Sequence, residues 1–458
     1  MSASRQPATP GVTVALAEYA ARVTFESLPS AVVIAVKRLI LDSLGTALAA
    51  GTMGDGCREL VDMAVACGGR PQSTILGFDR KGPAPLVALA NGGLVHALNY
   101  DAGGPGHLGV VALVAPLAAA EYVGGVSGKE LIAASATACE ITARMSVAAH
   151  GADIRGELPW LAGQFLSYVG SAAGAGRALR LSPLQMHSAI ALAVMQAAGT
   201  RQVVLDGDPP AKAVYGAFPN QGGMQAALLA QLGLRADCAA LEGSGGFYAA
   251  FLGDSSRAAG IADGLGDRYV LAGVQFKAWP TSGVVAPYVE AALNLRRTHG
   301  LSADVVARVE FTGGERMRHW CEPLEERRAP ASGATAANSI FFGIANALVH
   351  GAVTLERFSP AGLSDPSVRR LMARTEYTVN ADPSEHAALR VWTTRGPAVE
   401  APVAASASPV TEAQLVAKFV DCARYAPRPM EADRVQRLVE LVLDLEAVAD
   451  VRSLTERL

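Results

Sequence analysis

Lysine and histidine are the scarce reactive side chains of this sequence. Its 458 residues hold only six lysines against thirty-three arginines, and eight histidines. A lysine ammonium is a compact positive charge that can bind a carboxylate and stabilise negative charge as a neighbouring C–H or C–C bond breaks. An imidazole titrates near neutral pH and can donate or accept a proton at a reacting carbon. Both residue types suit acid–base chemistry on a small anion.

Other kinds of reactive site have no signature in the sequence. The six cysteines are scattered without a CxxC pair, so neither a zinc module nor a disulfide framework is expected. No histidine, cysteine and carboxylate cluster has metal-ligand spacing, and no GxSxG motif occurs. The glycine-rich segments 103–106 and 243–246 lack nucleotide-binding spacing and are expected to be flexible loops. We expect neither a metal nor a cofactor.

Charge and hydropathy narrow the choice of partner. The formal net charge is −3 and no run of like charges occurs, so neither nucleic acid nor a membrane surface is indicated. The longest apolar run, 109–120, is too short to cross a bilayer and contains Pro116. The N-terminus lacks the continuous apolar run of a signal peptide, since Glu18 interrupts its only apolar stretch. A cytoplasmic protein with a small-molecule partner is expected.

Most of the first 270 residues have the periodicity of helices. Apolar residues recur at helical spacing, and several of these segments begin at Ser or end at Gly, as helix caps do. We predict helices at 33–48, 84–99, 109–123, 128–149, 168–179, 183–198 and 222–232.

The pattern changes after about residue 270. Short alternating runs with β-branched or aromatic residues predict strands at 307–312, 376–380 and 389–393, with helices at 340–350 and 367–374 between them. The Pro-, Ala- and Ser-rich segment 396–410 is interpreted as a linker or mobile loop. Helical periodicity returns at 410–458. The predicted fold is mainly α, with a large helical domain made from 1–272 and 411–458 and an inserted α+β domain at 273–410.

Several ordered segments resemble one enzyme family. The segment 90–144 resembles a family motif in which His-Ala-Leu-Asp-Phe-Asp-Asp-Thr is followed by His-Pro-Gly and a long helical pair. The segment 211–234, with Lys212 eleven residues before a glycine and an Ala-Ala-Leu-Leu-Ala helix, and the FKAWP segment at 276–280 resemble two further family motifs. Weaker similarity extends from about 13 to 458. The chain is therefore identified as similar to the MmgE/PrpD family, which includes 2-methylcitrate dehydratase and cis-aconitate decarboxylase.

The resemblance carries expectations about architecture and activity. It implies that the inserted α+β domain is a lid, that the protein is a homodimer, and that the active site lies in the cleft between helical domain and lid. It also implies a metal-free enzyme that removes water or carbon dioxide from small polycarboxylates, or epimerises them.

Four residues match family positions that we expect to be catalytic. Lys212 and Lys277 match the two pocket lysines, and His107 matches the His of the His-Pro-Gly motif, although Leu108 replaces its proline. Asp101 is the retained acidic residue of the Asp-rich motif. His96, at the start of that motif, is expected to orient a loop rather than to perform chemistry.

Other pocket positions depart from the family pattern. Asn99 and Gly103 stand where the motif has Asp and Thr, and Leu161 stands where a second pocket histidine is expected. Leucine cannot transfer a proton, so the substrate is expected to carry fewer carboxylates or a larger apolar part. Further substrate contacts are expected from residues that match no catalytic position with certainty: Tyr215, which replaces a His, Arg201, Gln202 and Trp320, the nearest candidate for the family's lid tyrosine.

Three functions remain open on these residues. The first is a cofactor-free lyase, with dehydration preferred over decarboxylation, that abstracts a proton next to a carboxyl or carbonyl group. The second is an isomerase, epimerase or cyclase that begins with the same proton abstraction. The third is a homologue that has lost catalysis and binds a ligand, which the changes at Asn99, Gly103 and Leu161 support and the two retained lysines oppose.

Overall fold

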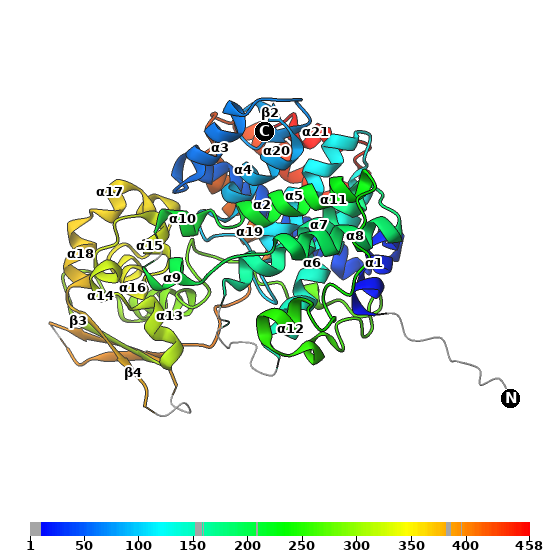
Figure 1. Ribbon diagram of the computed structural model, residues 1–458. Coiled ribbons are helices and arrows are strands. Elements are labelled where there is room, and N and C mark those ends of the chain that lie inside the picture. Colours follow the sequence, from blue (N-terminus) through cyan, green and yellow to red (C-terminus); the bar gives the residue numbers. More distant parts are fainter. Residues whose placement is uncertain (1–10, 152–157, 159, 208, 382–385, 395) are drawn as a thin grey trace.

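Two lobes of unequal size make up the molecule (Figure 1). The computed structural model describes residues 11–151, 158, 160–207, 209–381, 386–394 and 396–458. The expectation that no signal peptide is present rests partly on residues 1–10, which lie outside the described residues. The larger lobe is mainly helical and contains the first and last described elements, α1 and α21, and the smaller lobe contains the four-stranded sheet.

Helix α2 (Ser30–Met53) is the central element of the larger lobe. It packs against α4 (Ala84–His96), α5 (Leu108–Val123) and the C-terminal helix α19 (Glu412–Ala423). Its apolar residues from Leu39 to Leu48 are almost fully inaccessible to solvent. A helix that is apolar on most sides must be covered by other helices, which explains why segments from the two ends of the chain meet around it.

The remaining long helices of the larger lobe stack closely. Helices α6 (Gly128–His150), α7 (Ala162–Ala178), α8 (Pro183–Gln196) and α11 (Ala217–Gln231) pack on one another and on α5. Ser127 and Ser182 start α6 and α8 through capping boxes, which supply partners for the first backbone N–H groups. A Cβ added at Gly174 of α7 would lie 2.8 Å from that of Ala138, so glycine is what permits this approach.

The predicted helices are confirmed, but the predicted starts of two of them are too late in the sequence. Helices α7 and α11 begin five or six residues before the predicted starts at 168 and 222. The first turn of α11 contains Pro219, which a first turn tolerates because its N–H groups have no partner within the helix. The other helices of this lobe are α1 (Val12–Arg22), α3 (Cys57–Ala66), α12 (Phe247–Leu252), α20 (Ala432–Leu443) and α21 (Arg452–Thr455). The short helices α9 (Gln202–Leu205) and α10 (Pro210–Ala213) lie against the smaller lobe (Figure 1).

A short hairpin interrupts the helices that the sequence predicted up to residue 270. Strands β1 (Ser73–Ile75) and β2 (Arg80–Gly82) pair antiparallel. The strands are three residues long, which is too short for the alternating pattern that identifies a strand in a sequence. The hairpin packs on α4 and α5, where Glu121 accepts hydrogen bonds from Thr74.

The smaller lobe is built on a four-stranded sheet with the order β4-β3-β5-β6. Strands β3 (Val306–Gly313) and β4 (Thr375–Val379) pair in parallel, whereas β5 (Ala388–Thr393) pairs antiparallel with β3 and with β6 (Val399–Pro402). The predicted strands at 307–312, 376–380 and 389–393 are confirmed. Helices of this lobe are α13 (Ala286–His299), α14 (Leu324–Arg328), α15 (Gly333–Ala337), α16 (Ile340–His350), α17 (Pro360–Leu363) and α18 (Pro366–Met372).

The interpretation of 396–410 as a linker or mobile loop is wrong at its beginning. Residues 399–402 form β6, the edge strand of the sheet, paired with β5 over four residues. Its side chains alternate between partly buried and exposed, but the strand has only four residues, too few for that alternation to identify it in the sequence. Pro402 stands at the end of an edge strand, where a missing N–H does least harm to a sheet.

Each lobe has its own hydrophobic core. The larger core includes residues of α2, α5 and α6 together with Leu415, Phe419 and Leu438 from the C-terminal helices. The smaller core gathers Phe311 and Phe341, whose ring centroids lie 5.2 Å apart, with apolar residues of α13 and α16. The protein is mainly α, as predicted. A division at 272 and 411 stays a prediction. No helix among the described residues is both long and apolar enough to cross a membrane.

Candidate active site

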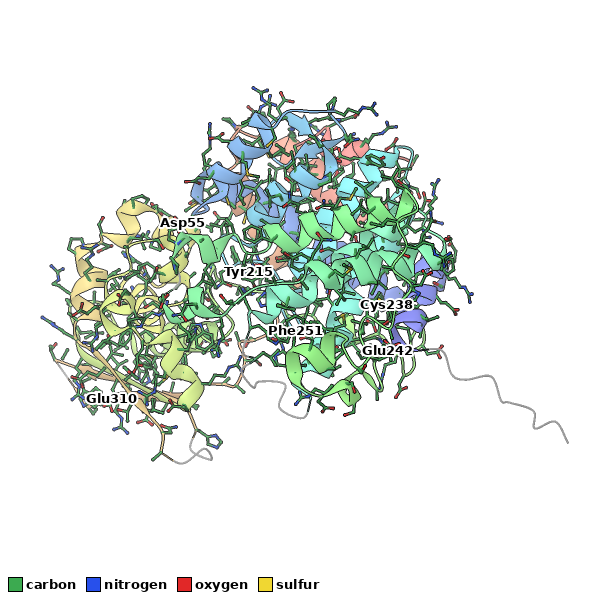
Figure 2. The ribbon with its side chains drawn as sticks, in the orientation of Figure 1. Asp55, Tyr215, Cys238, Glu242, Phe251 and Glu310 are labelled. Carbon is green, nitrogen blue, oxygen red and sulfur yellow. The ribbon has the colours of Figure 1, made fainter. Side chains whose placement is uncertain are left out.

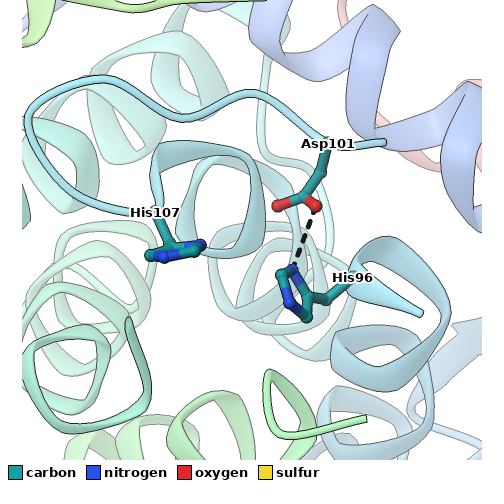
Figure 3. Close-up of side chains that lie close together, drawn as sticks. All are labelled: His96, Asp101 and His107. Carbon is teal, nitrogen blue, oxygen red and sulfur yellow. Dashed lines mark hydrogen bonds and ion pairs between the residues drawn. The ribbon is translucent and has the colours of Figure 1, made fainter. Parts of the chain in front are cut away.

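The segment 97–107, which connects α4 to α5, brings three ionisable side chains together (Figure 3). His96 is the last residue of α4, and His107 immediately precedes α5. The Nδ1 atom of His96 lies 3.0 Å from Oδ1 of Asp101. Asn99 has a φ of 49°, in the left-handed region, which turns the chain so that Asp101 returns to His96. A nitrogen of each histidine and an oxygen of Asp101 lie within 4.8 Å of one another.

Tyr215 joins this cluster from the segment before α11. Its hydroxyl lies 2.9 Å from Nδ1 of His107, and its ring centroid lies 4.2 Å from that of His96. Figure 2 labels Tyr215 in the larger lobe, near the region where the two lobes meet. A hydroxyl and a neutral imidazole can each donate or accept in such a hydrogen bond. Tyr215 and His107 therefore form a pair through which a proton can pass.

Burial sets the protonation of the two rings and the phenol. Desolvation, together with the nearby His96, lowers the pKa of His107 to about 3. Desolvation also lowers the pKa of His96. The pKa of Tyr215 is raised well above its ordinary value, first by desolvation and then by the charge of Asp101. At neutral pH His107 is thus a neutral imidazole able to accept a proton, and Tyr215 is a protonated donor.

Asp101 remains a carboxylate in this buried place. Desolvation would raise the pKa of its carboxyl group, but His96, Lys277 and His107 outweigh it and hold that pKa at about 2. Its Oδ1 pairs with His96, while the buried Oδ2 has no hydrogen-bond partner among the described residues. Figure 3 shows this second oxygen on the side of Asp101 that faces His107. A buried carboxylate oxygen without a donor is a natural acceptor for a substrate hydroxyl or a water.

Lys277 lies beside the same segment. Its Nζ donates to the main-chain oxygen and to Oδ1 of Asn99, each at 2.7 Å. Desolvation, with Lys418 and Lys212 adding repulsion, lowers the pKa of the Lys277 ammonium to about 8 although Asp101 opposes the shift. The amide Nδ2 of Asn99 donates in turn to Asn338 of the smaller lobe, so Asn99 connects Lys277 to both lobes.

Lys212 lies on α10 and is half-buried. Its positive charge is among the causes that lower the pKa of His96, of His107 and of Lys277. The two ammonium groups therefore act on the same pair of rings, as a shared anion pocket requires.

The other predicted substrate contacts lie in varied surroundings. Leu161 precedes α7, with its N–H donating to the carbonyl of Gly199. Arg201 is half-buried at the start of α9. Gln202 is exposed and donates to Asp206 on its own helix. Trp320 packs against the core of the smaller lobe and against the ring of His319.

Two features of the cluster differ from the sequence interpretation. Gly103 was placed in a flexible loop, but its N–H and carbonyl pair with Gln275 at 2.9 and 3.1 Å. The expectation that no cluster has metal-ligand spacing is wrong in space, since His96, Asp101 and His107 converge as three possible ligands. The charges of Lys212 and Lys277 act on these rings, so a cation would be repelled where an anion would be attracted.

Gly163 offers a test of how tightly the pair is packed. A Cβ added there would lie 2.5 Å from the Tyr215 hydroxyl and 2.6 Å from a ring carbon of His107. We expect Gly163→Ala to displace one of these groups and to lower turnover by about 10²-fold, since a shift near 1 Å has that effect. Gly245→Ala, where an added Cβ meets nothing within 4 Å, is the control. Steady-state kinetics of both variants would check this, and equal rates would contradict it.

The lowered pKa of His107 also predicts how stability depends on pH. His107 has a pKa of about 3 in the folded protein against an ordinary value of 6.5, so the unfolded chain binds more protons between these values. The free energy of unfolding should therefore fall as pH drops below about 6.5, by at most about 1.4 kcal/mol per pH unit for this histidine. Urea unfolding from about pH 7 to about pH 5 should show a shallower decline in His107→Asn. If the decline of the free energy of unfolding with pH were the same in His107→Asn, the His107 imidazole would be solvated rather than desolvated.

Taken together, the fold and the cluster define a mainly helical protein in which two histidines, an aspartate and a tyrosine lie beside two lysines. The MmgE/PrpD N-terminal domain matches residues 14–258, and the MmgE/PrpD C-terminal domain matches 279–445. The chain belongs to the MmgE/PrpD family.

Curated relatives cover nearly the whole chain at low identity. A cis-aconitate decarboxylase-like protein, oryM, from Aspergillus oryzae is 27% identical over 97% of this chain and 96% of its own. Cis-aconitate decarboxylase from Aspergillus terreus is 24% identical over 98% and 96%. The human cis-aconitate decarboxylase is 25% identical over 76% and 72%. The family is one of lyase-type enzymes.

Proposed function

We propose that this protein is a lyase that transfers a proton at a carbon next to a carboxyl or carbonyl group. The observation that carries the proposal is the Tyr215–His107 hydrogen bond beside the Asp101–His96 pair, in a buried place where Lys277 and Lys212 supply positive charge. The site lies between the larger lobe and the smaller lobe, which acts as a lid over it in a homodimer.

The protonation states suit the first chemical step. Neutral His107 accepts the proton, and the electron pair of the broken C–H bond moves toward the adjacent carboxyl or carbonyl group. The ammonium groups of Lys277 and Lys212 stabilise the negative charge that develops there. The Asp101 carboxylate bonds to Nδ1 of His96 and so fixes the orientation of the His96 ring. The ring of Tyr215 packs against that of His96. The Tyr215 hydroxyl then acts as the proton donor of the pair.

Dehydration is the preferred outcome. In that reaction the electron pair forms a carbon–carbon double bond as the neighbouring C–O bond breaks. The leaving hydroxide takes the proton of the Tyr215 hydroxyl and departs as water, and His107 then returns the abstracted proton to Tyr215 through their hydrogen bond. The unpartnered Oδ2 of Asp101, which faces His107, suits a hydroxyl on the substrate. The names of the relatives favour loss of carbon dioxide instead, in which the electron pair of the broken C–C bond is protonated by a pocket acid.

The substrate differs from the usual polycarboxylates of the family. Asn99 carries a neutral amide where the family motif has a carboxylate, so it adds no charge to the pocket. Its amide is hydrogen-bonded to Lys277 and Asn338. Leu161 and Gly103 supply no proton and no hydroxyl. We therefore expect a substrate with one or two carboxylates and a larger apolar part, in a reaction that needs neither a metal nor a cofactor.

Isomerisation, epimerisation or cyclisation is the second candidate. Each begins with the same proton abstraction, and Leu161 in place of an ionisable ring removes one acid that would assist a leaving group. The proton then returns to carbon instead of a group being expelled.

Incubation with a panel of hydroxy and keto carboxylic acids in deuterated water separates these functions. A lyase gives a product lighter by water or carbon dioxide, as we expect. An isomerase gives deuterium uptake without loss of mass. A binding protein gives neither, while its melting temperature rises with one of the acids. The last result would overturn the proposal that the protein is an enzyme.

A further inference from the structure

A second buried charged pair lies behind the proposed site. Lys418 of α19 and Asp42 of α2 form an ion pair of 2.6 Å, and their side chains are 5% and 0% exposed. Burying two charges is costly, and an apolar pair of similar volume is often at least as stable. The pair comes from opposite ends of the chain, and the chemistry described above uses neither residue.

The contacts of this pair fall on both sides of Asp101. Lys418 Nζ donates to the carbonyl oxygen of Tyr100 at 2.6 Å and lies 3.7 Å from the centroid of the Tyr100 ring. Asp42 Oδ2 accepts from the N–H of Ala102 at 2.9 Å. The backbone immediately before and after Asp101 is thus held by one charged partner each.

The same pair reaches the backbone of Lys277. Lys418 Nζ donates to the carbonyl oxygen of Lys277 at 3.3 Å, and the Tyr100 hydroxyl donates to the carbonyl of Ala278 at 3.1 Å. Gly103 and Gln275 pair their backbones beside these contacts. The segment that carries Asp101 and the segment that carries Lys277 are therefore joined to each other and to the ion pair.

We propose that Lys418 and Asp42 are positioning residues that fix Asp101 and Lys277 relative to each other from behind the site. This inference rests on the proposed function. An apolar pair could fill the same volume, but it would leave the Tyr100 and Lys277 carbonyls and the Ala102 N–H without these partners. The charges of Lys418 and Asp42 therefore serve to position the Asp101 and Lys277 segments rather than to stabilise the fold.

The first experiment separates positioning from folding. The double variant Asp42→Leu with Lys418→Met removes both charges, so no lone charge is left buried, and its melting temperature should lie above that of Lys418→Met alone. We expect kcat of the double variant to stay about 10²-fold below the native value, because the two segments are no longer held. Recovery of kcat together with stability would overturn the proposal.

Two further variants complete this experiment. Lys418→Arg keeps the charge but presents a planar fork in place of a compact ammonium, so it should fold and still show a lowered kcat with little change in KM. Lys37→Met is the matched control: Lys37 lies on α2 with Asp42, and its ammonium binds Glu446 and the carbonyl of Leu443 near the other end of the chain. It should lower the melting temperature and leave kcat unchanged. Native kcat in Lys418→Arg would count against positioning.

A second measurement needs no substrate. Desolvation is the main cause that lowers the pKa of the Lys277 ammonium to about 8, and the charge of Lys418, whose Nζ bonds to the Lys277 carbonyl, lowers it further. Trace acetylation followed across pH by peptide mass spectrometry reports that pKa directly. In Lys418→Met the midpoint for Lys277 should rise because a repelling charge is removed, whereas Lys37→Met should leave it in place.

The two measurements distinguish the two proposals. If the native protein turns over no acid, the proposed function fails, and the shift in acetylation midpoint still supports the link between Lys418 and Lys277. An acetylation midpoint in Lys418→Met equal to the native one would overturn that link, whatever the kinetics show.

Discussion

His107→Asn is expected to lower kcat/KM by about 10²–10⁴-fold, the range that a positioned acid–base group contributes. In the proposed function the neutral imidazole accepts the proton, and its Nδ1 lies 2.9 Å from the Tyr215 hydroxyl. Asparagine keeps a polar group near Nδ1 but cannot accept a proton at neutral pH. Turnover should therefore fall while the protein remains folded, as circular dichroism and thermal melting would show.

Tyr215→Phe is the companion of this change. It removes only the hydroxyl that bonds to His107, and the ring contact with His96 is retained. We expect a loss in turnover that does not add to that of His107→Asn in the double variant, because the two groups act as one unit. Native turnover in His107→Asn would show that the acid–base centre lies elsewhere.

Lys277→Met should have the next largest effect, a loss of about 10²–10³-fold in kcat, which is typical of removing one group that stabilises developing negative charge. Methionine fills much of the volume but carries no charge. The two hydrogen bonds to Asn99 are lost as well, so KM for an anionic substrate should rise. Steady-state kinetics over a range of substrate concentration separates the two effects.

Lys277→Arg and Lys81→Met are the controls for this prediction. Arginine keeps the charge but cannot place a single compact donor between the two oxygens of Asn99, so only partial activity is expected. Lys81 lies exposed on β2, and its removal should leave the kinetics unchanged. A native kcat in Lys277→Met would mean that this lysine is structural.

Periodicity and caps were enough to predict most of the fold. Helices such as α6 and α8 begin at serine capping boxes and have long apolar faces, and both signals are local. The errors fall where the signal is not local. Strand β6 depends on pairing with β5 at a sheet edge, and the hairpin of β1 and β2 depends on packing against α4 and α5. Neither has enough residues to show a pattern of its own.

The site could be predicted only in part, for a related reason. Resemblance to family motifs predicts His107 and Lys277, whereas for His96 it predicts only an orienting role outside the catalytic set. Its pairing with Asp101 depends on the left-handed turn at Asn99, and its contact with Tyr215 joins positions more than a hundred residues apart. The Asp42–Lys418 pair spans most of the chain, so sequence spacing carried no sign of it.

Solvent deuterium incorporation at the carbon next to the carboxyl group tests the central claim most directly. Proton NMR of the substrate pool and product in deuterated water would follow it in the native protein and in His107→Asn. If His107 transfers the proton, the native protein should place deuterium at one carbon, and His107→Asn should slow that exchange by about 10²-fold or more. Equal exchange in the two proteins, or none in the native protein with any acid it binds, would contradict the account.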